Sequence, residues 1–276
     1  MINANYAQAT AGSTRLFDLR ETDRAPEASA EVRTIGDAAD RRLIVHPEAD
    51  PVFVEQYRRL GAALHQAQLE NGVRSVMVAS AVAAEGKTLS ATNLALILSR
   101  FKKRVLLVDG DLRKPSIHRL LGIENGIGLT DMLKRPGGQL WAHTLSPTLS
   151  VVTGGQHDPD PMALLISDAV RQFMTQAQDQ FDWIIVDTPP IVLFPDARLF
   201  ADRLDTCVMV VSAATTASPV AVAAVDALGV SRILGVVLNR ADSSEIASGY
   251  GYGYGRYGAA SPGRRGPFAR WRSARS

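Results

Sequence analysis

Six short apolar segments recur along this chain of 276 residues, and they constrain its fold more than any other feature. Each segment is five to seven residues long, is rich in Val, Ile or Leu, and lacks a regular alternation of apolar with polar residues. Strands of a parallel sheet have this composition because helices cover both of their faces. We therefore predict a mostly parallel sheet with strands at 75–80, 105–109, 149–153, 183–187, 207–212 and 233–239.

Longer segments with a helical spacing of apolar residues separate the predicted strands. A further helix is expected to begin at Pro51 after an N-cap at Asp50, because Val54, Tyr57 and Leu60 follow at helical spacing. The alternation of strands and helices predicts a doubly wound α/β domain, since parallel neighbours need crossover connections. The crossover helices are expected at 88–101, 161–178 and 218–229.

The two ends of the chain differ in composition from its centre. Residues 1–45 are rich in Ala, Thr, Asp, Glu and Arg without a sustained period, which predicts a disordered arm. Residues 243–276 are rich in Gly, Tyr and Arg, which predicts a flexible tail. One folded domain over 46–242 remains, and a hydrophobic content of 46% is enough for a sizeable core.

Composition also excludes several classes of protein. A single cysteine, Cys207, excludes a disulfide framework and any site with several cysteine ligands for a metal. No apolar run has the length of a membrane span, and the first residues lack the pattern of a signal peptide. We expect a cytoplasmic protein.

The loop after the first predicted strand, within ASAVAAEGKTLS (79–90), carries the first chemical motif. Glycine, lysine and threonine between a strand and a helix form a phosphate-binding loop, in which backbone N–H groups and the lysine hold phosphates and the hydroxyl binds Mg²⁺. The strict pattern has a glycine where Ala81 stands, so an accidental GKT is the alternative. We assign to ATP binding Ala83, Ala84, Glu85, Gly86, Lys87, Thr88 and Leu89.

Carboxylates follow two other predicted strands. VLLVDGDLRKP contains Asp109, Asp111 and Arg113, and WIIVDTPP ends its strand at Asp187. Ligands of open α/β sheets bind beyond the carboxyl ends of the strands, so all three carboxylates would face Lys87. Taken singly, an aspartate at a strand end is more often a turn or cap residue. Their combination with the loop predicts a site that holds Mg²⁺ beside phosphates.

Together these motifs resemble those of the bacterial tyrosine kinases of capsule and exopolysaccharide synthesis, the CpsD/CapB type, which are P-loop NTPases related to the MinD/ParA ATPases. The likeness consists of a deviant Walker A loop, the D-x-D-x-R motif from Asp109 to Arg113, the D-T-P-P motif from Asp187, and a C-terminal tyrosine cluster. It covers roughly 50–240 and the tail.

The resemblance implies a role for each matching residue. Lys87 and Thr88 are implied to bind ATP and Mg²⁺, Asp109 to orient or deprotonate the tyrosine, and Asp111 and Asp187 to hold the metal. Lys87, Asp109, Asp111 and Asp187 are therefore our predicted catalytic residues, and Thr88, Asp111 and Asp187 our predicted metal ligands. Asn239 stands where the broader group has an asparagine at the adenine. Arg113 is expected either at the ATP phosphates or as a structural partner of Asp111.

The tyrosine cluster is the predicted substrate. A flexible segment of roughly 11 to 18 residues beyond Asn239 spans about 17 to 25 Å, enough to reach its own active site or that of a neighbour. The predicted phosphoacceptors are Tyr250, Tyr252, Tyr254 and Tyr257.

The resemblance also implies partners. Relatives act with a transmembrane polysaccharide co-polymerase, here a separate chain of the Wzz type at the inner face of the membrane, and with a cognate phosphotyrosine phosphatase. Homo-oligomers are implied through an E-x-x-R-x-x-R motif, of which Glu55 and Arg58 match while Gly61 replaces the last arginine. Ala84 departs from the family too, because alanine at a left-handed position of the loop carries strain.

Two other functions are alternatives to the kinase. The first is a regulatory ATPase of the MinD/ParA kind without kinase activity, although Val82 stands where that group has its signature lysine. The second is a binding module whose basic tail engages nucleic acid or anionic lipid. The tyrosine cluster and the D-L-R-K-P sequence favour the kinase, for which no nucleic-acid partner is expected.

Overall fold

The computed structural model describes residues 39–213 and 215–241. The predicted tail from residue 243 onward, with its four tyrosines, lies outside the described residues, as does the predicted arm up to residue 38.

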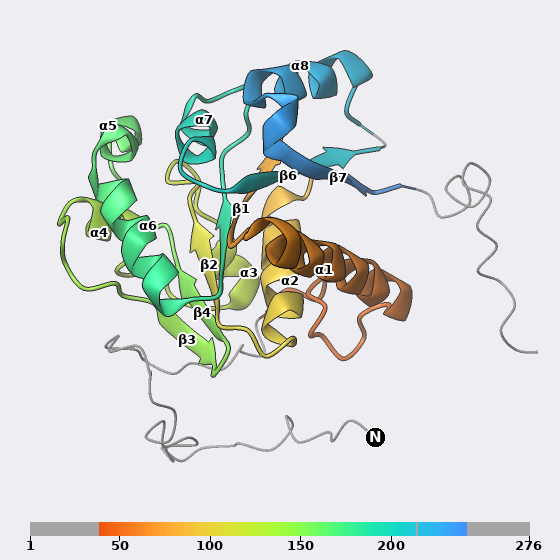
Figure 1. The fold of residues 1–276 in the computed structure, drawn as a ribbon, viewed down its shortest axis with the longest axis horizontal. Helices are drawn as coiled ribbons and strands as arrows, with labels where there is room; N and C mark the ends of the chain where they lie inside the picture. Colours follow the sequence, from red (N-terminus) through yellow and green to blue (C-terminus); the bar gives the residue numbers. More distant parts are fainter. Residues whose placement is uncertain (1–38, 214, 242–276) are drawn as a thin grey trace, which may run out of the picture. The chain divides into compact units, whose positions relative to one another are not determined.

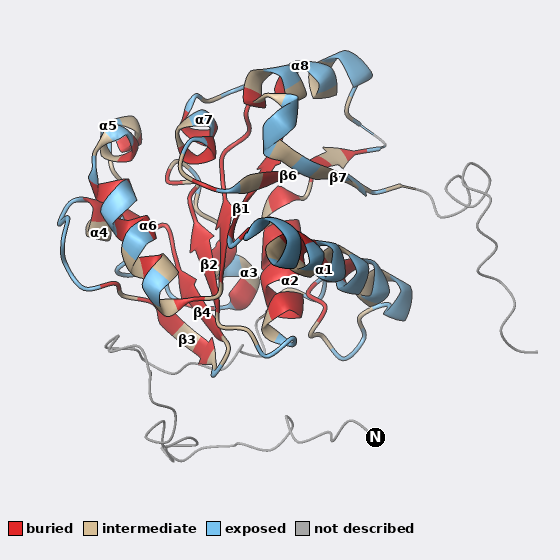
Figure 2. Cartoon of the chain, in the orientation of Figure 1, coloured by how far each residue is buried: buried red, intermediate tan, exposed pale blue. Residues whose placement is uncertain are grey.

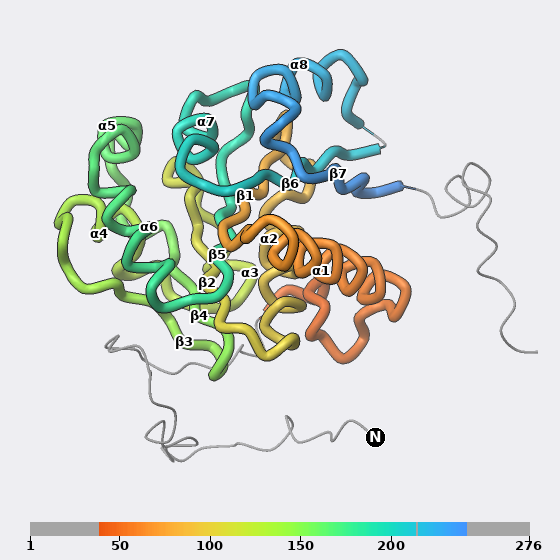
Figure 3. Tube along the Cα trace, in the orientation of Figure 1, coloured from red at the N-terminus to blue at the C-terminus, as the bar shows by residue number. Residues whose placement is uncertain are grey.

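A seven-stranded sheet forms the centre of the domain (Figure 1), in the order β3-β4-β2-β5-β1-β6-β7, and Figure 3 labels all of its strands. All neighbours pair in parallel except β3 and β4. The six predicted strands are confirmed, and their bounds are β1 Ser75–Ser80, β2 Val105–Asp109, β4 Leu149–Val152, β5 Trp183–Asp187, β6 Thr206–Ser212 and β7 Ile233–Asn239. The seventh, β3 (His143–Ser146), was not predicted, because an edge strand of four residues has no extended apolar run.

Helices cover both faces of this sheet, which confirms the doubly wound α/β fold (Figure 1). One face carries α1 (Pro51–Asn71), α2 (Lys87–Ser99) and α3 (Ile117–Leu121). The other carries α4 (Leu129–Leu133), α5 (Pro161–Ile166), α6 (Ala169–Gln180), α7 (Asp196–Ala201) and α8 (Ser218–Leu228), which a short 3₁₀ turn (Val230–Arg232) follows. Within the described residues, no helix is both long enough and apolar enough to cross a bilayer.

The central strands are buried on both faces, and Figure 2 shows this burial. In β1, Val76 and Val78 pack with the helices α1 to α3, while Met77 and Ala79 pack with the helices of the opposite face. The two-residue period of a strand thus divides one apolar run between two cores.

Most helix ends follow their local signals. Asp50 accepts a hydrogen bond from the N–H of Val52 (2.8 Å), as predicted, and Asp160 caps α5 at the N–H of Ala163 (3.2 Å). The predicted helix over 161–178 is divided in two at Ser167, whose backbone is extended. The Ser167 hydroxyl donates to the carbonyl of Leu164 (2.6 Å), which offers the backbone an alternative to the helix.

The end of the predicted N-terminal arm is packed against α2, which corrects our boundary at residue 45. Leu43 and Ile44 are buried. The N–H of Ile44 donates to Oδ1 of Asn93 (2.9 Å), and Nδ2 of Asn93 donates to the carbonyl of Arg42 (3.2 Å). Two apolar residues and one asparagine are too few to predict from the sequence that this segment packs against the domain.

Candidate active site

The loop between β1 and α2 has the geometry of an anion cradle. Gly86 has a φ of 93° and lies directly before the first residue of α2, Lys87. In the described part of the chain, the backbone N–H groups of residues 84 to 88 donate no hydrogen bond. Unsatisfied N–H groups at a helix N-terminus attract phosphate oxygens through hydrogen bonding and through the helix dipole.

The two alanines that depart from the glycine pattern have different consequences. Ala81 is fully buried in the core of the α4–α8 face, so the chain enters the loop without needing a glycine there. Ala84 has a φ of 65°, a left-handed conformation that is unfavourable for a residue with a Cβ atom. The strain that the sequence predicted at Ala84 is therefore present.

Lys87 forms a buried ion pair with Asp187 at the end of β5. Its Nζ lies 2.6 Å from Oδ1 of Asp187, and the exposed fractions of the two side chains are 7% and 0%. The same Nζ donates to Oγ1 of Thr88 (3.4 Å), which also accepts from the hydroxyl of Ser116 (3.3 Å). Lysine, threonine and carboxylate therefore meet in one cluster at the start of α2, in which the lysine and the carboxylate are buried and the threonine is partly buried.

Asp109 lies beside this cluster, because β2 and β5 pair in register with Asp109 opposite Asp187. Burial, reinforced by the charge of Asp187, raises the pKa of Asp109 to about 7. Its Oδ2 accepts the N–H groups of Ser116 (2.8 Å) and Ile117 (2.9 Å), which hold the carboxyl in place. Burial also raises the pKa of Asp187, against the opposing effect of Lys87.

Each of these two carboxyl groups has one oxygen that makes none of these contacts. Oδ1 of Asp109 and Oδ2 of Asp187 are buried and have no hydrogen-bond partner among the described residues. A buried carboxylate oxygen without a partner is costly, so the pair suits a cation or a proton between them. Oxygen donors of this kind, next to the Thr88 hydroxyl, fit Mg²⁺, which takes one or two carboxylates with phosphates and water.

The other two residues of the D-x-D-x-R motif have separate partners. Asp111 is half-buried in the turn after β2, where its Oδ1 accepts the N–H of Lys114 (3.0 Å). Arg113 forms a two-pronged ion pair with Asp196 of α7, at 2.7 and 3.1 Å, and its guanidinium lies 4.7 Å from the ring centre of Phe194. The expected pairing of Arg113 with Asp111 is therefore wrong, and its binding to ATP stays a prediction.

Three of the residues that we assigned to nucleotide binding make side-chain contacts within the protein. The carboxylate of Glu85 is buried, with an exposed fraction of 1% for the residue, and is used within the protein. Leu89 packs against the core of the α1–α3 face. Nδ2 of Asn239 donates to the carbonyl of Glu85 (2.8 Å). Glu85 and Leu89 can thus contact a nucleotide through their backbones, and the role of Asn239 at the adenine stays a prediction.

Comparisons with known proteins show what this chain is similar to. Residues 72–243 match the family model ParA, described as NUBPL iron-transfer P-loop NTPase. The tyrosine-protein kinase YwqD of Bacillus subtilis (strain 168) is 35% identical over 221 residues, which are 79% of this chain and 93% of YwqD.

The chain belongs to the bacterial tyrosine-protein kinases. Membership of this ParA-like group of P-loop NTPases implies that the kinase binds a nucleotide.

Solved structures place the kinase in the same group. The chimerical protein CapA2B2 matches with a TM-score of 0.67 and 28% identity, over 76% of this chain and 95% of that one. The kinase domain of the Escherichia coli tyrosine kinase ETK matches with a TM-score of 0.63 and 30% identity, over 73% of this chain and 80% of that one. The predicted family and fold are therefore confirmed.

Three residues of the site were not predicted from the sequence of the kinase. Ser116 contacts Thr88, Asp196 binds Arg113, and Thr216 contacts Glu85. Only Ser116 had a usable signal, because a serine before the IHRLL helix marks a helix start close to the D-x-D-x-R motif. The partners of Asp196 and Thr216 lie 83 and 131 residues away in the chain, where no spacing rule applies.

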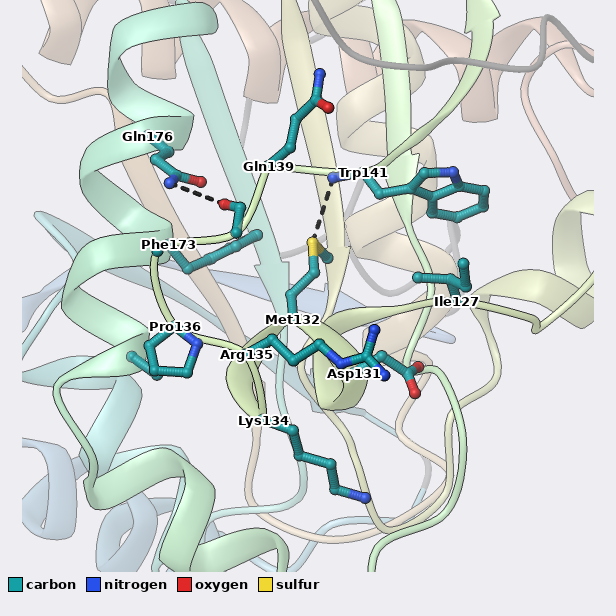
Figure 4. Close-up of a pocket in the computed structure, with 13 residues that line it drawn as sticks. Ile127, Asp131, Met132, Lys134, Arg135, Pro136, Gln139, Trp141, Phe173 and Gln176 are labelled. Atoms are coloured by element: carbon teal, nitrogen blue, oxygen red, sulfur yellow. Dashed lines mark hydrogen bonds between the residues drawn. The ribbon is translucent and has the colours of Figure 1, made fainter.

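Elsewhere in the kinase, a pocket lies between the 127–141 segment and α6 (Figure 4). Its volume is about 560 Å³, and Trp141 lines one of its sides. The side chain of Gln176 ties α6 to the carbonyl of Gly138 (3.0 Å), and Lys134 is in an ion pair with Asp158 at 2.7 Å. None of the predicted site residues lines this pocket, so it is separate from the candidate active site.

Proposed function

We propose that this chain is an ATP-dependent protein-tyrosine kinase that phosphorylates its own C-terminal cluster, Tyr250, Tyr252, Tyr254 and Tyr257. The observation that carries the proposal is the buried Lys87–Asp187 pair at the start of α2, next to loop N–H groups that donate no hydrogen bond to any described residue. This arrangement suits a triphosphate, because it combines a fixed positive charge, a helix N-terminus and carboxylates for a metal.

Each residue at this edge of the sheet has a task in phosphoryl transfer. The loop N–H groups bind the phosphates, and Lys87 shares its ammonium between Asp187 and the terminal phosphates. Thr88, Asp111 and Asp187 would hold Mg²⁺, which neutralises phosphate charge when it is bound. Ser116 and Lys87 flank the Thr88 hydroxyl and orient it.

Asp109 is the proposed base for the acceptor tyrosine. A tyrosine hydroxyl has a pKa near 10 and is a poor nucleophile unless a base takes its proton as transfer proceeds. A carboxyl with a pKa of about 7 is matched to proton transfer at neutral pH, and its free Oδ1 can accept the tyrosine proton. Transfer of the terminal phosphoryl group of ATP to the tyrosine oxygen gives ADP and phosphotyrosine.

The same proposal extends to the cellular role. The kinase would regulate the polymerisation and export of exopolysaccharide or capsule at the inner face of the membrane, through a separate transmembrane co-polymerase. A phosphotyrosine phosphatase would reverse the reaction, and copies of the chain would assemble through α1. The motifs shared with kinases of capsule and exopolysaccharide synthesis support this assignment.

The experiment incubates the full chain with ATP, Mg²⁺ and the cytoplasmic segments of a candidate co-polymerase, and maps phosphate by mass spectrometry. We expect phosphotyrosine within residues 250–257, and its loss in Lys87→Met. Lys134→Met is the matched control, because it removes a lysine from an ion pair outside the site. ATP hydrolysis without phosphotyrosine in this region would favour the regulatory ATPase instead.

A further inference from the structure

The side chain of Glu85 is directed away from the phosphate cradle and into the protein. One oxygen accepts the N–H of Val82 at the start of the loop (2.8 Å). The other accepts the N–H of Ser212 at the end of β6 (3.3 Å) and the hydroxyl of Thr216. The carbonyl of the same residue accepts Nδ2 of Asn239 at the end of β7. One residue therefore joins the phosphate loop to the ends of two neighbouring strands.

Glu85 is not part of an ion pair in the described chain, although its carboxylate is buried. A buried charge without a partner is unfavourable, and only hydrogen bonds to its oxygens can offset the lost hydration. Three donors do so here, and two of them come from the β6–α8 region, far from the loop in sequence. The carboxylate therefore depends on that region being in place, and the region in turn depends on the carboxylate.

The position of the Glu85 contacts in the sheet indicates which part of a bound nucleotide lies near them. Lys87, Asp187 and Asp109 define the reacting end of a nucleotide, and they lie over β5 and β2, on one side of β1. Glu85 contacts the ends of β6 and β7, on the other side of β1. A nucleotide whose terminal phosphate is at Lys87 and which lies across the loop has its ribose and base on the β6–β7 side.

The loop conformation gives the same contacts a second role. Ala84, directly before Glu85, has a left-handed φ of 65°. A strained residue persists only where its surroundings fix it, and the hydrogen bonds of Glu85 are the nearest such constraint. The contacts that hold the β6–α8 segment thus also hold the phosphate loop in its binding conformation.

We propose that Glu85 is a positioning residue that couples the base-binding side of the nucleotide site to the phosphate loop, through its bonds to Thr216, Ser212 and the Asn239 amide. This inference rests on the proposed function in one respect, namely that the ligand of the loop is a nucleoside triphosphate. It predicts that the contribution of the base to affinity depends on Glu85 more strongly than the contribution of the phosphates does.

The experiment measures the affinity of the full chain for ATP and for inorganic tripolyphosphate, each with Mg²⁺, by calorimetry. Glu85→Gln keeps the shape of the side chain but places an amide N–H₂ against a donor. Thr216→Val removes a single hydroxyl outside the loop. Controls are Glu70→Gln and Thr175→Val, at exposed positions of α1 and α6.

We expect both test variants to bind ATP more weakly, by about tenfold or more in Glu85→Gln, since hydrogen bonds to a charged group are lost. In Thr216→Val the affinity for tripolyphosphate should change by less than about threefold, because Glu85 keeps its bond to the Val82 N–H and the loop N–H groups and Lys87 are retained. In Glu85→Gln the affinity for tripolyphosphate should fall by a smaller factor than the affinity for ATP. Thr216→Ser, which keeps the hydroxyl, should restore ATP binding. The controls should match the wild type for both ligands.

Two results would overturn the proposal. An equal loss of affinity for ATP and for tripolyphosphate would mean that Glu85 supports only the phosphate loop. Unchanged affinities for both ligands would mean that Glu85 does not couple the base-binding side to the loop. Thermal melting of each variant identifies any general loss of folding, and Thr216→Val keeps the test valid if Glu85→Gln is unstable. A chain that binds ATP but forms no phosphotyrosine would count against the proposed function alone.

Discussion

Nζ of Lys87 lies 2.6 Å from Oδ1 of Asp187, in a contact from which solvent is almost entirely excluded. The lysine is the first residue of α2 and the aspartate the last of β5, so the pair joins a helix start to the carboxyl end of a strand. The charge of each residue offsets the cost of burying the other. A bound triphosphate would pair with the Lys87 ammonium as well. The Asp187 carboxylate would then be free to bind a metal.

Replacing Lys87 by methionine should therefore destabilise the fold as well as abolish transfer. Removing one member of a buried pair leaves an uncompensated charge, which costs about 3 to 5 kcal/mol. The loss should be smaller at pH 5 than at pH 8, because burial already raises the pKa of Asp187 and a protonated carboxyl needs no partner. Urea denaturation at the two pH values measures it.

The control for this variant is Lys134→Met, which breaks the ion pair with Asp158. The Lys134 side chain has an exposed fraction of 42%, so its loss should cost less than about 1 kcal/mol. Equal losses in the two variants would contradict the burial argument for Lys87.

Asp109 should make the stability of the ligand-free protein depend on pH. Its pKa of about 7 is above the unfolded value of 3.8, so between these two values the folded state binds more protons than the unfolded state. The free energy of unfolding contributed by this group therefore falls as the pH rises through that window. Asp109→Asn should remove this fall in the free energy of unfolding. Between pH 4 and pH 8, the difference in unfolding free energy between variant and wild type should therefore shift in favour of the variant by on the order of 4 kcal/mol.

Chemical denaturation of both proteins from pH 4 to pH 8 provides the measurement for Asp109. Only the difference between the two curves is informative, because other groups titrate in both proteins. Parallel curves would show that burial does not raise the pKa of Asp109, and would remove the basis for its role as a base near neutral pH.

Ala84→Gly should stabilise the phosphate loop. A left-handed φ costs a residue with a Cβ atom about 1 to 2 kcal/mol, and glycine avoids this at the expense of a more flexible unfolded chain. The net gain in unfolding free energy should be about 1 kcal/mol, measured by urea denaturation. Ala83→Gly is the matched control, because Ala83 does not have a positive φ and should lose about 0.5 to 1 kcal/mol. The strain argument fails if both substitutions change the free energy of unfolding in the same direction.

Gly61→Arg should destabilise the domain, although it completes the E-x-x-R-x-x-R motif. A Cβ atom at Gly61 would lie 3.0 Å from Cγ2 of Ile97 and 3.2 Å from Cε2 of Phe101, since this side of α1 faces α2. Overpacking of this kind costs about 1 to 3 kcal/mol. Ala62→Arg, on the exposed side of the helix, should change stability by less than about 0.5 kcal/mol. A neutral Gly61→Arg would show that α1 can move away from α2.

Local patterns were sufficient for the sheet and for the position of the loop. The six apolar runs became strands because continuous Val, Ile and Leu can be buried only where helices cover both faces. Gly86 and Lys87 lie at the start of the helix that follows β1, as their neighbours in the sequence indicated. Short elements such as β3 and α3 escaped prediction, because four or five residues do not establish a period.

The strand set, the family motifs and the residue types at the carboxyl edge of the sheet follow from local patterns in the chain. The partners of the charged residues follow from the fold: Lys87 pairs with Asp187, 100 residues away, Arg113 with Asp196 rather than Asp111, and Glu85 with Thr216. The physical reason is that local periodicity records which face a residue occupies. The partner of a buried charge depends instead on which strands become neighbours.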